Sequence, residues 1–169
     1  QHASSRKIPG GSQDINDYAV FGLASVSLLN DNSLKVQAGL RAAYNSAFSA
    51  PVIPAVNVLY KASERVQLRA SYARGFRAPS LKEMYLRFVV ANHEIFGNEK
   101  LRPEYGDHLH LSLSGNLYRN GPDYAGIMVT GFYNNVKNGI VLVPLRPEDS
   151  TSIEYMYVNL AAQRNAIGT

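Results

Sequence analysis

Histidine side chains are the first candidates for ligand chemistry in this sequence. The neutral imidazole of His93 is a competent iron ligand, although a loop histidine is equally suited to capping or packing within its own segment. His108 and His110 fall on one face of an expected strand, where an i, i+2 pair could chelate a metal ion. The alternative is ordinary polarity, because Ser112 continues the same face. We therefore take His93, with Tyr85 in the same segment, as a ligand-binding candidate and assign no metal site.

Arginine side chains occur around the same stretch. Arg74, Arg77 and Arg87 could attract an anionic ligand, because gathered charges of one sign focus the electric field. For Arg77 the alternative is structural pairing with Glu83 or Glu104. We add Arg77 and Arg87 to the ligand-binding candidates.

Several classes of function find no support. The sequence has no nucleophile elbow and no converging Ser/His/Asp set, so we expect no catalysis. With no cysteine it can form no disulfide or thiolate metal site. The net charge of +4 is modest and the basic residues are scattered, which argues against a nucleic-acid partner. No cofactor is expected.

Apolar and polar residues alternate with period two, which predicts β-strands. The clearest runs are 33–45, 64–74 and 107–118. Each exceeds the ~5–6 residues typical of strands in soluble domains. On the expected apolar faces lie Val66, Leu68, Ala70 and Tyr72 of the second run and Leu109, Leu111 and Leu113 of the third. Further strands are expected at 18–29, 52–61, 124–143 and 154–162, giving about seven.

Tight and longer connections alternate along the chain. Tight turns are expected at 30–32, around Ser63 and at 120–123, and longer connections at 45–50, 76–103 and 144–152. Short turns at one end and long loops at the other are typical of outer-membrane β-barrels. No apolar run approaches the ~20 residues that a transmembrane helix needs. The expected fold is all-β, an antiparallel meander forming part of a transmembrane barrel, with residues 18–169 in the barrel.

The ends of the chain and of its strands add two expectations. Residues 1–17 are polar and are expected to be loop or disordered, and they contain no signal peptide, so any targeting segment would lie upstream. Tyrosines near strand ends would form an interfacial girdle in a barrel, or the edge of the core in a sandwich. They are Tyr44, Tyr60, Tyr72 and Tyr118.

The long connection at 76–103 is itself expected to be structured. Ser80 and Glu83 form a Ser-x-x-Glu capping box, which predicts a short helix carrying Met84, Tyr85 and Phe88. A structured excursion of this length between strands is usually functional.

Four motifs in order resemble those of TonB-dependent receptors. They are FRAP at 76–79, GNEKLRPE at 97–104, GFYNNVKNGI at 131–140 and YVNLAAQRNAIG at 157–168, and the likeness covers roughly 33–168. Glu99 stands where that family usually has proline. The resemblance implies a twenty-two-stranded barrel filled by an N-terminal plug, of which this chain would be a fragment without plug or TonB box. It places the segment 75–104 on the extracellular side, and His93 where haem receptors of the family have an iron-ligating histidine.

The function implied by the resemblance is TonB-dependent uptake of a metal chelate, haem or cobalamin-like nutrient across the bacterial outer membrane. The implied partners are a small-molecule ligand (a siderophore, haem or cobalamin), TonB acting through the missing plug region, and outer-membrane lipid. The alternative function is a soluble all-β ligand-binding module.

Overall fold

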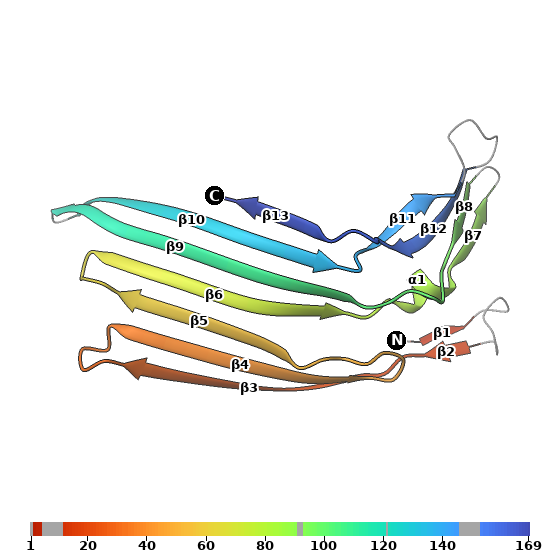
Figure 1. Cartoon of the computed structure of the whole chain (residues 1–169), viewed down its shortest axis with the longest axis horizontal. Helices are drawn as coiled ribbons and strands as arrows, with labels where there is room; N and C mark the ends of the chain where they lie inside the picture. Colours follow the sequence, from red (N-terminus) through yellow and green to blue (C-terminus); the bar gives the residue numbers. More distant parts are fainter. Residues whose placement is uncertain (1, 5–11, 91–92, 121, 146–152) are drawn as a thin grey trace.

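Seven strands of the computed structural model form one antiparallel sheet, which we call the main sheet (Figure 1). The structure describes residues 2–4, 12–90, 93–120, 122–145 and 153–169. The strands of the main sheet, from one edge to the other, are β13 (Arg164–Gly168), β10 (Asp123–Lys137), β9 (Glu104–Asn120), β6 (Val66–Arg77), β5 (Ile53–Lys61), β4 (Leu34–Asn45) and β3 (Asp17–Leu28). This confirms the expected all-β meander, and the sheet is open rather than closed into a barrel.

The remaining elements lie at one end of the main sheet (Figure 1). A four-stranded sheet, the upper sheet, has the order β11-β12-β8-β7, with β12 and β8 parallel. Its strands are β7 (Arg87–Val90), β8 (His93–Phe96), β11 (Ile140–Pro144) and β12 (Ile153–Asn159). The helix α1 (Leu81–Tyr85) and the paired strands β1 (His2–Ser4) and β2 (Ser12–Asp14) complete the fold. No helix in the described ranges is long and apolar enough to cross a membrane.

The register between β6 and β9 places their apolar residues on one face. Leu68 lies directly opposite Leu113, and Ala70 opposite Leu111. Since opposite residues in an antiparallel pair share a face, the predicted common face is confirmed. The Leu111 and Leu113 side chains are each 49% exposed. This apolar face therefore has no covering layer among the described residues.

A β-bulge in β9 changes which residues reach the apolar face. Ala125 pairs with Tyr118 and Gly126 with Asn116, so Leu117 has no direct partner. An extra residue in one strand reverses the alternation beyond it. The Tyr118 side chain therefore lies on the apolar face, opposite Ala125. Simple alternation along the strand would have placed Leu117 there instead.

The two ends of the main sheet differ in their connections, as predicted. At the end we call the turn end, consecutive strands are joined through 29–33, 62–65 and 121–122. At the loop end the connections are 46–52, 78–103 and 138–163. The first turn is closed by the Asn32 amide, which donates to the Leu29 carbonyl at 3.1 Å.

The expected single strand at 124–143 is wrong, because the structure divides it into β10 and β11. Asn138 adopts φ 56° and Gly139 follows it. A left-handed residue turns the chain out of a pleated strand, and asparagine tolerates that conformation better than most residues. The chain thereby leaves the main sheet and enters the upper sheet.

Three other expected elements also differ from the structure. The strand expected at 154–162 is β12 of the upper sheet, and the seventh strand of the main sheet is β13 instead. The helix ends at Tyr85, so Phe88 lies in β7. Within 1–17, expected as loop, residues 2–4 and 12–14 pair as β1 and β2. These strands are short and without alternation, so no periodic signal marks them.

The apolar face should tolerate charge much less than the polar face. Leu111→Lys would put an ammonium group in the middle of the face that the resemblance assigns to lipid, at a cost of roughly 2–4 kcal/mol. We expect less folded, heat-modifiable receptor on unboiled gels and a lower urea midpoint. The matched control is His110→Lys, one residue away on the polar face. Equal loss of folding in both variants would contradict a lipid-facing surface at Leu111.

Candidate ligand-binding site

The helix α1 opens the segment that carries most of the predicted ligand residues. Its capping box is present: the Ser80 hydroxyl accepts from the Glu83 amide at 3.2 Å, and the Glu83 carboxylate accepts from the Ser80 amide at 2.8 Å. A five-residue helix is unstable alone. Its buried side chains, Leu81 and Met84, pack with Ile15 and Leu101 into a small hydrophobic cluster that holds it.

Arg77 connects α1 to the main sheet through two carboxylates. Its Nη1 lies 3.0 Å from Glu83 and its Nε 2.5 Å from Glu104, so the structural pairing considered above is present with both acids. The carboxylates are 15% and 19% exposed, against 46% for the arginine. Glu104 also accepts from the Ile140 amide. This ion-pair cluster therefore joins β6, α1, β9 and β11.

Burial and hydrogen bonding shift the pKa of the Glu83 carboxyl in opposite directions. Burial alone would raise the pKa of this carboxyl, but hydrogen bonds from Ser80 and the neighbouring Arg77 guanidinium outweigh it and hold the pKa below its ordinary value. Glu83 is therefore charged throughout the neutral range.

Asparagine side chains tie the upper sheet to the same region. The Asn159 amide group donates to the carbonyls of Arg102 and Asn138 at 2.8 and 2.7 Å, and its Oδ1 accepts from the Arg102 amide at 2.7 Å. Asn98 donates to the Tyr157 carbonyl at 2.9 Å. The sequence analysis did not predict that Asn98 and Asn159 anchor the upper sheet. Both residues lie in the motifs named above, at 97–104 and 157–168, and those motifs were the only sign of their role.

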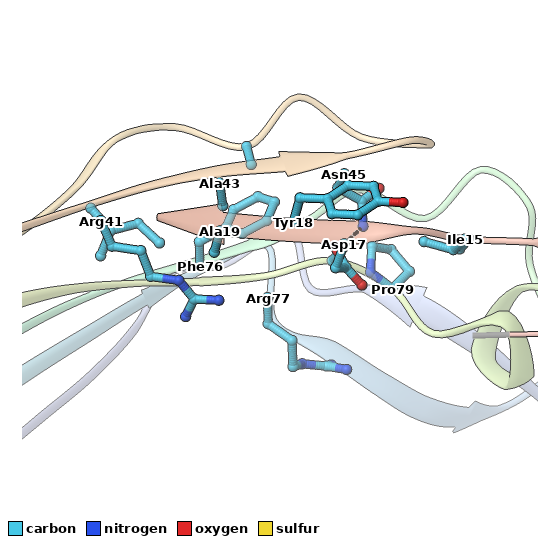
Figure 2. Close-up of a pocket in the computed structure, with 13 residues that line it drawn as sticks. Ile15, Asp17, Tyr18, Ala19, Arg41, Ala43, Asn45, Phe76, Arg77 and Pro79 are labelled. Carbon is cyan, nitrogen blue, oxygen red and sulfur yellow. Dashed lines mark hydrogen bonds between the residues drawn. The ribbon is translucent and has the colours of Figure 1, made fainter. Parts of the chain in front are cut away.

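A cavity of about 310 Å³ lies at the loop end, between the ends of β3, β4 and β5 and the segment that follows β6. Figure 2 shows Arg41 and Arg77 among the residues that line it. Asn45 donates to Asp17 across its rim at 2.5 Å. Arg41 forms no ion pair within the part of the chain that the structure describes. The cavity thus presents the Arg41 guanidinium, which can pair with an anionic group of a ligand, together with the Asp17 carboxylate.

The structure does not gather the predicted ligand residues into one pocket. Arg77 is held in the ion-pair cluster, and Tyr85 packs against the hydrophobic cluster. Arg87 is exposed on β7, with Cζ 5.9 Å from the centre of the Phe96 ring. His93 pairs through its backbone with Val90, and its side chain lies outside the described structure. Arg87 and His93 therefore stand at opposite ends of the β7–β8 pair.

The two strand histidines do not converge as a chelate. His108 Nδ1 lies 2.8 Å from the Asn134 Oδ1, and its Nε2 is 3.0 Å from where a Cβ would stand at Gly106. The ring therefore leans over Gly106 and away from His110. Among the described residues, no group of three or more His, Cys, Asp or Glu side chains is placed to hold a metal.

Removing the Asn159 side chain should loosen the upper sheet. Asn159→Ala leaves three backbone groups of the loop end without their partner, at an expected cost of about 1–3 kcal/mol. Amide hydrogen exchange should accelerate in β12 and around Arg102. Asn165→Ala, which removes an exposed side chain of β13, is the control and should leave exchange there unchanged. Unaltered protection in the Asn159 variant would contradict the anchoring role.

The depressed pKa of Glu83 predicts a pH dependence with a definite sign. A carboxyl whose folded-state pKa is lowered stabilises the fold above its ordinary value of 4.5, and this contribution is lost as the pH falls through the folded-state value. Amides of α1 should lose protection below that pH, after correction for intrinsic exchange. A Glu83→Gln variant should lack this step and be less protected at neutral pH. An identical pH profile in both proteins would contradict the assignment.

Comparisons with known proteins agree with this geometry. The family described as TonB dependent receptor-like, beta-barrel matches residues 4–166. The siderophore receptor PirA from Pseudomonas aeruginosa aligns over 94% of this chain and 31% of its own, with 23% identity and a TM-score of 0.75. The ferric enterobactin receptor PfeA from the same organism, in complex with enterobactin, aligns over 94% and 24%, with 22% identity and a TM-score of 0.69.

A receptor solved with haem bound is also similar in fold, at a lower sequence identity. The Serratia marcescens hemophore receptor HasR, in complex with its hemophore HasA and heme, aligns over 91% of this chain and 31% of its own, with 15% identity and a TM-score of 0.73. A search of curated proteins finds no match. The chain thus spans a quarter to a third of the length of these receptors. It belongs to the TonB-dependent receptor β-barrel family, whose members are receptors and transporters rather than enzymes.

Proposed function

We propose that the chain is part of an outer-membrane receptor that captures an anionic iron chelate, of the siderophore class, and imports it with energy from TonB. The observation that carries the proposal is the loop-end cavity, which the Arg41 guanidinium lines without an ion pair among the described residues, in a chain of this family. The alternative of a soluble all-β module is not favoured, because the family match covers nearly the whole chain.

The two faces of the main sheet support an orientation in the membrane. We assign the apolar face to lipid, the polar face to the barrel lumen and the loop end to the cell exterior, because long loops of outer-membrane barrels are extracellular. Within residues 18–169 the main sheet would form this part of the barrel wall, and the excursions 78–103 and 138–163 would lie beyond it. In the complete receptor a plug would fill the lumen and present the short segment that TonB binds.

The charges at the loop end support an anionic ligand over a neutral one. Arg41 lines the cavity, and Arg87 is exposed on the upper sheet. We propose that Arg41, Arg87 and His93 contact the ligand. The carboxylates of Glu83 and Glu104 already neutralise Arg77, so we assign Arg77, with the partly buried Tyr85, to positioning the upper sheet.

Haem is the second candidate ligand, since HasR is similar in fold and His93 lies in β8 of the upper sheet. If His93 ligates haem iron, His93→Ala in the complete receptor should weaken haem binding and abolish growth on haem as sole iron source. His108→Ala, on the polar face of the main sheet, is the control. Unchanged haem affinity in the His93 variant would leave the siderophore class ahead.

The siderophore proposal predicts a specific effect of Arg87. Removing an exposed cation that contacts an anionic chelate should weaken binding about tenfold, equivalent to ~1.4 kcal/mol. We expect this loss for Arg87→Ala in titrations of the complete receptor with ferric siderophores, and it should shrink at high salt. Lys100→Ala is the matched control, because Lys100 is an exposed cation away from β7.

Two results would contradict the proposed function. One is that the complete receptor binds no ferric siderophore, haem or cobalamin at micromolar concentration. The other is that uptake of a bound iron chelate continues at full rate in cells that lack TonB.

A further inference from the structure

Three cations gather on the polar face of the main sheet near its turn end. Lys35 of β4 and Arg69 of β6 lie on either side of Leu59 of β5, each directly opposite it. Lys61 lies two residues further along β5, on the same face. All three charged side chains are exposed. Strand geometry places the Cα atoms of this group, which we call the lumen cations, about 8–10 Å apart.

The lumen cations have no anionic partner within the part of the chain that the structure describes. Their direct neighbours on the same face are neutral, and they are Ser27, Gln67 and Ser112. Asp31 and Glu64 lie in the turns just beyond, and among the described residues neither forms an ion pair with the group. Like charges repel when their separation is close to the Debye length, ~8 Å in physiological salt. An anion bound among them would therefore be stabilised.

The polar face between the loop-end cavity and the lumen cations carries no carboxylate on the described strands β3, β4, β5 and β6. Arg41, which lines the cavity, precedes this stretch on β4 and lies about 20 Å from Lys35. The two rows between them hold apolar side chains or neutral hydrogen-bonding ones. They are Leu23, Gly39, Ala55 and Ala73 in the first row, and Ser25, Gln37, Asn57 and Ser71 in the second. An anion that leaves Arg41 along this face meets no negative charge before it reaches the lumen cations.

We propose that the lumen cations form a second anion-binding site, which receives the anionic metal chelate after it leaves the loop-end cavity and before it reaches the periplasm. Negatively charged oxygens of the chelate pair with Lys35, Lys61 and Arg69, while Leu59 at the centre of the group contacts its apolar part. The cations are exposed, so each pairing is weak. Weak binding suits a transported ligand, because the ligand must leave the site again.

The inference rests on the proposed function, which supplies the orientation of the sheet and the anionic cargo. The alternative occupant of the lumen cations is an acidic segment of the plug. The chelate is favoured because neutral rows connect these cations to the cavity without an intervening negative charge. The two occupants are distinguished by whether transport of the chelate or retention of the plug depends on the three cations.

The first test separates capture from transport in the complete receptor, with ferric enterobactin and haem as anionic probes. The K35Q/K61Q/R69Q variant should bind its probe with an unchanged Kd, because the loop-end cavity is intact. At saturating probe it should import roughly fivefold more slowly, because the local attraction for the anion is lost. K35R/K61R/R69K keeps the charges and should import at the unaltered rate. R74Q/K100Q/K137Q, which removes three exposed cations elsewhere, is the matched control.

The second test does not depend on the cargo. Isotope-labelled methyl groups are attached to the lysines of the complete receptor in neutral detergent, and the paramagnetic hexacyanochromate trianion is added while NMR spectra are recorded. The Lys35 and Lys61 signals, assigned through K35R and K61R, should broaden at a concentration about threefold lower than those of the exposed Lys82 and Lys100. R69Q should remove this difference.

Three results would overturn the inference. They are full-rate import by K35Q/K61Q/R69Q, equal broadening of all four lysine signals, and faster amide exchange of the plug in K35Q/K61Q/R69Q, since the cations would then hold the plug instead of the chelate. A receptor that shows the preferential broadening but binds neither ferric enterobactin nor haem would refute only the proposed function.

Discussion

The pairing of β6 with β9 is the contact on which the rest of the structure depends. These strands are separated by the excursion 78–103, yet they pair without interruption from Val66↔Gly115 to Arg77↔Glu104. A slip of one residue would exchange the faces of the strands on one side of this pairing and bring their charged side chains onto the apolar face. The ladder ends on the Arg77–Glu104 ion pair, which also holds Glu83 of α1. Register in the wall and placement of the loop are thus set together.

The ligand site follows from the way chain segments leave the wall. Left-handed Asn138 directs the chain from β10 into β11, and the buried Pro79 directs it from β6 into α1. Both exits are fastened by side chains to neighbouring backbone, through Asn159 at the first and Ser80 with Glu83 at the second. The proposed ligand contacts on the upper sheet, Arg87 and His93, consequently lie on an anchored unit. Such anchoring would reduce the conformational entropy lost on ligand binding.

Alternation predicted the long strands because a two-residue period survives in any sheet with one apolar face. It failed where pairing is non-local or the strand is short. The parallel strands β8 and β12 pair in a register that places His93 opposite Ile153. Residues so far apart in the sequence cannot be identified as partners from a local pattern. The bulge at Leu117 was likewise hidden, since it depends on the register of β10. For the candidate site, the residues near α1 could be predicted from their motif. Arg41 could not, because its cavity exists only where several strand ends meet.

The upper sheet joins the main sheet at four points along the chain, at 78–86, 97–103, 138–139 and 160–163. Its strands come from two different excursions, yet β8 and β12 are hydrogen-bonded into one unit. These excursions cannot move as independent loops, because displacement of either one would break the ladder between them. Any closure over a captured molecule would instead be the tilt of a single rigid body about its four attachments. Labels placed on β7 and on β11 would then report the same motion at the same rate.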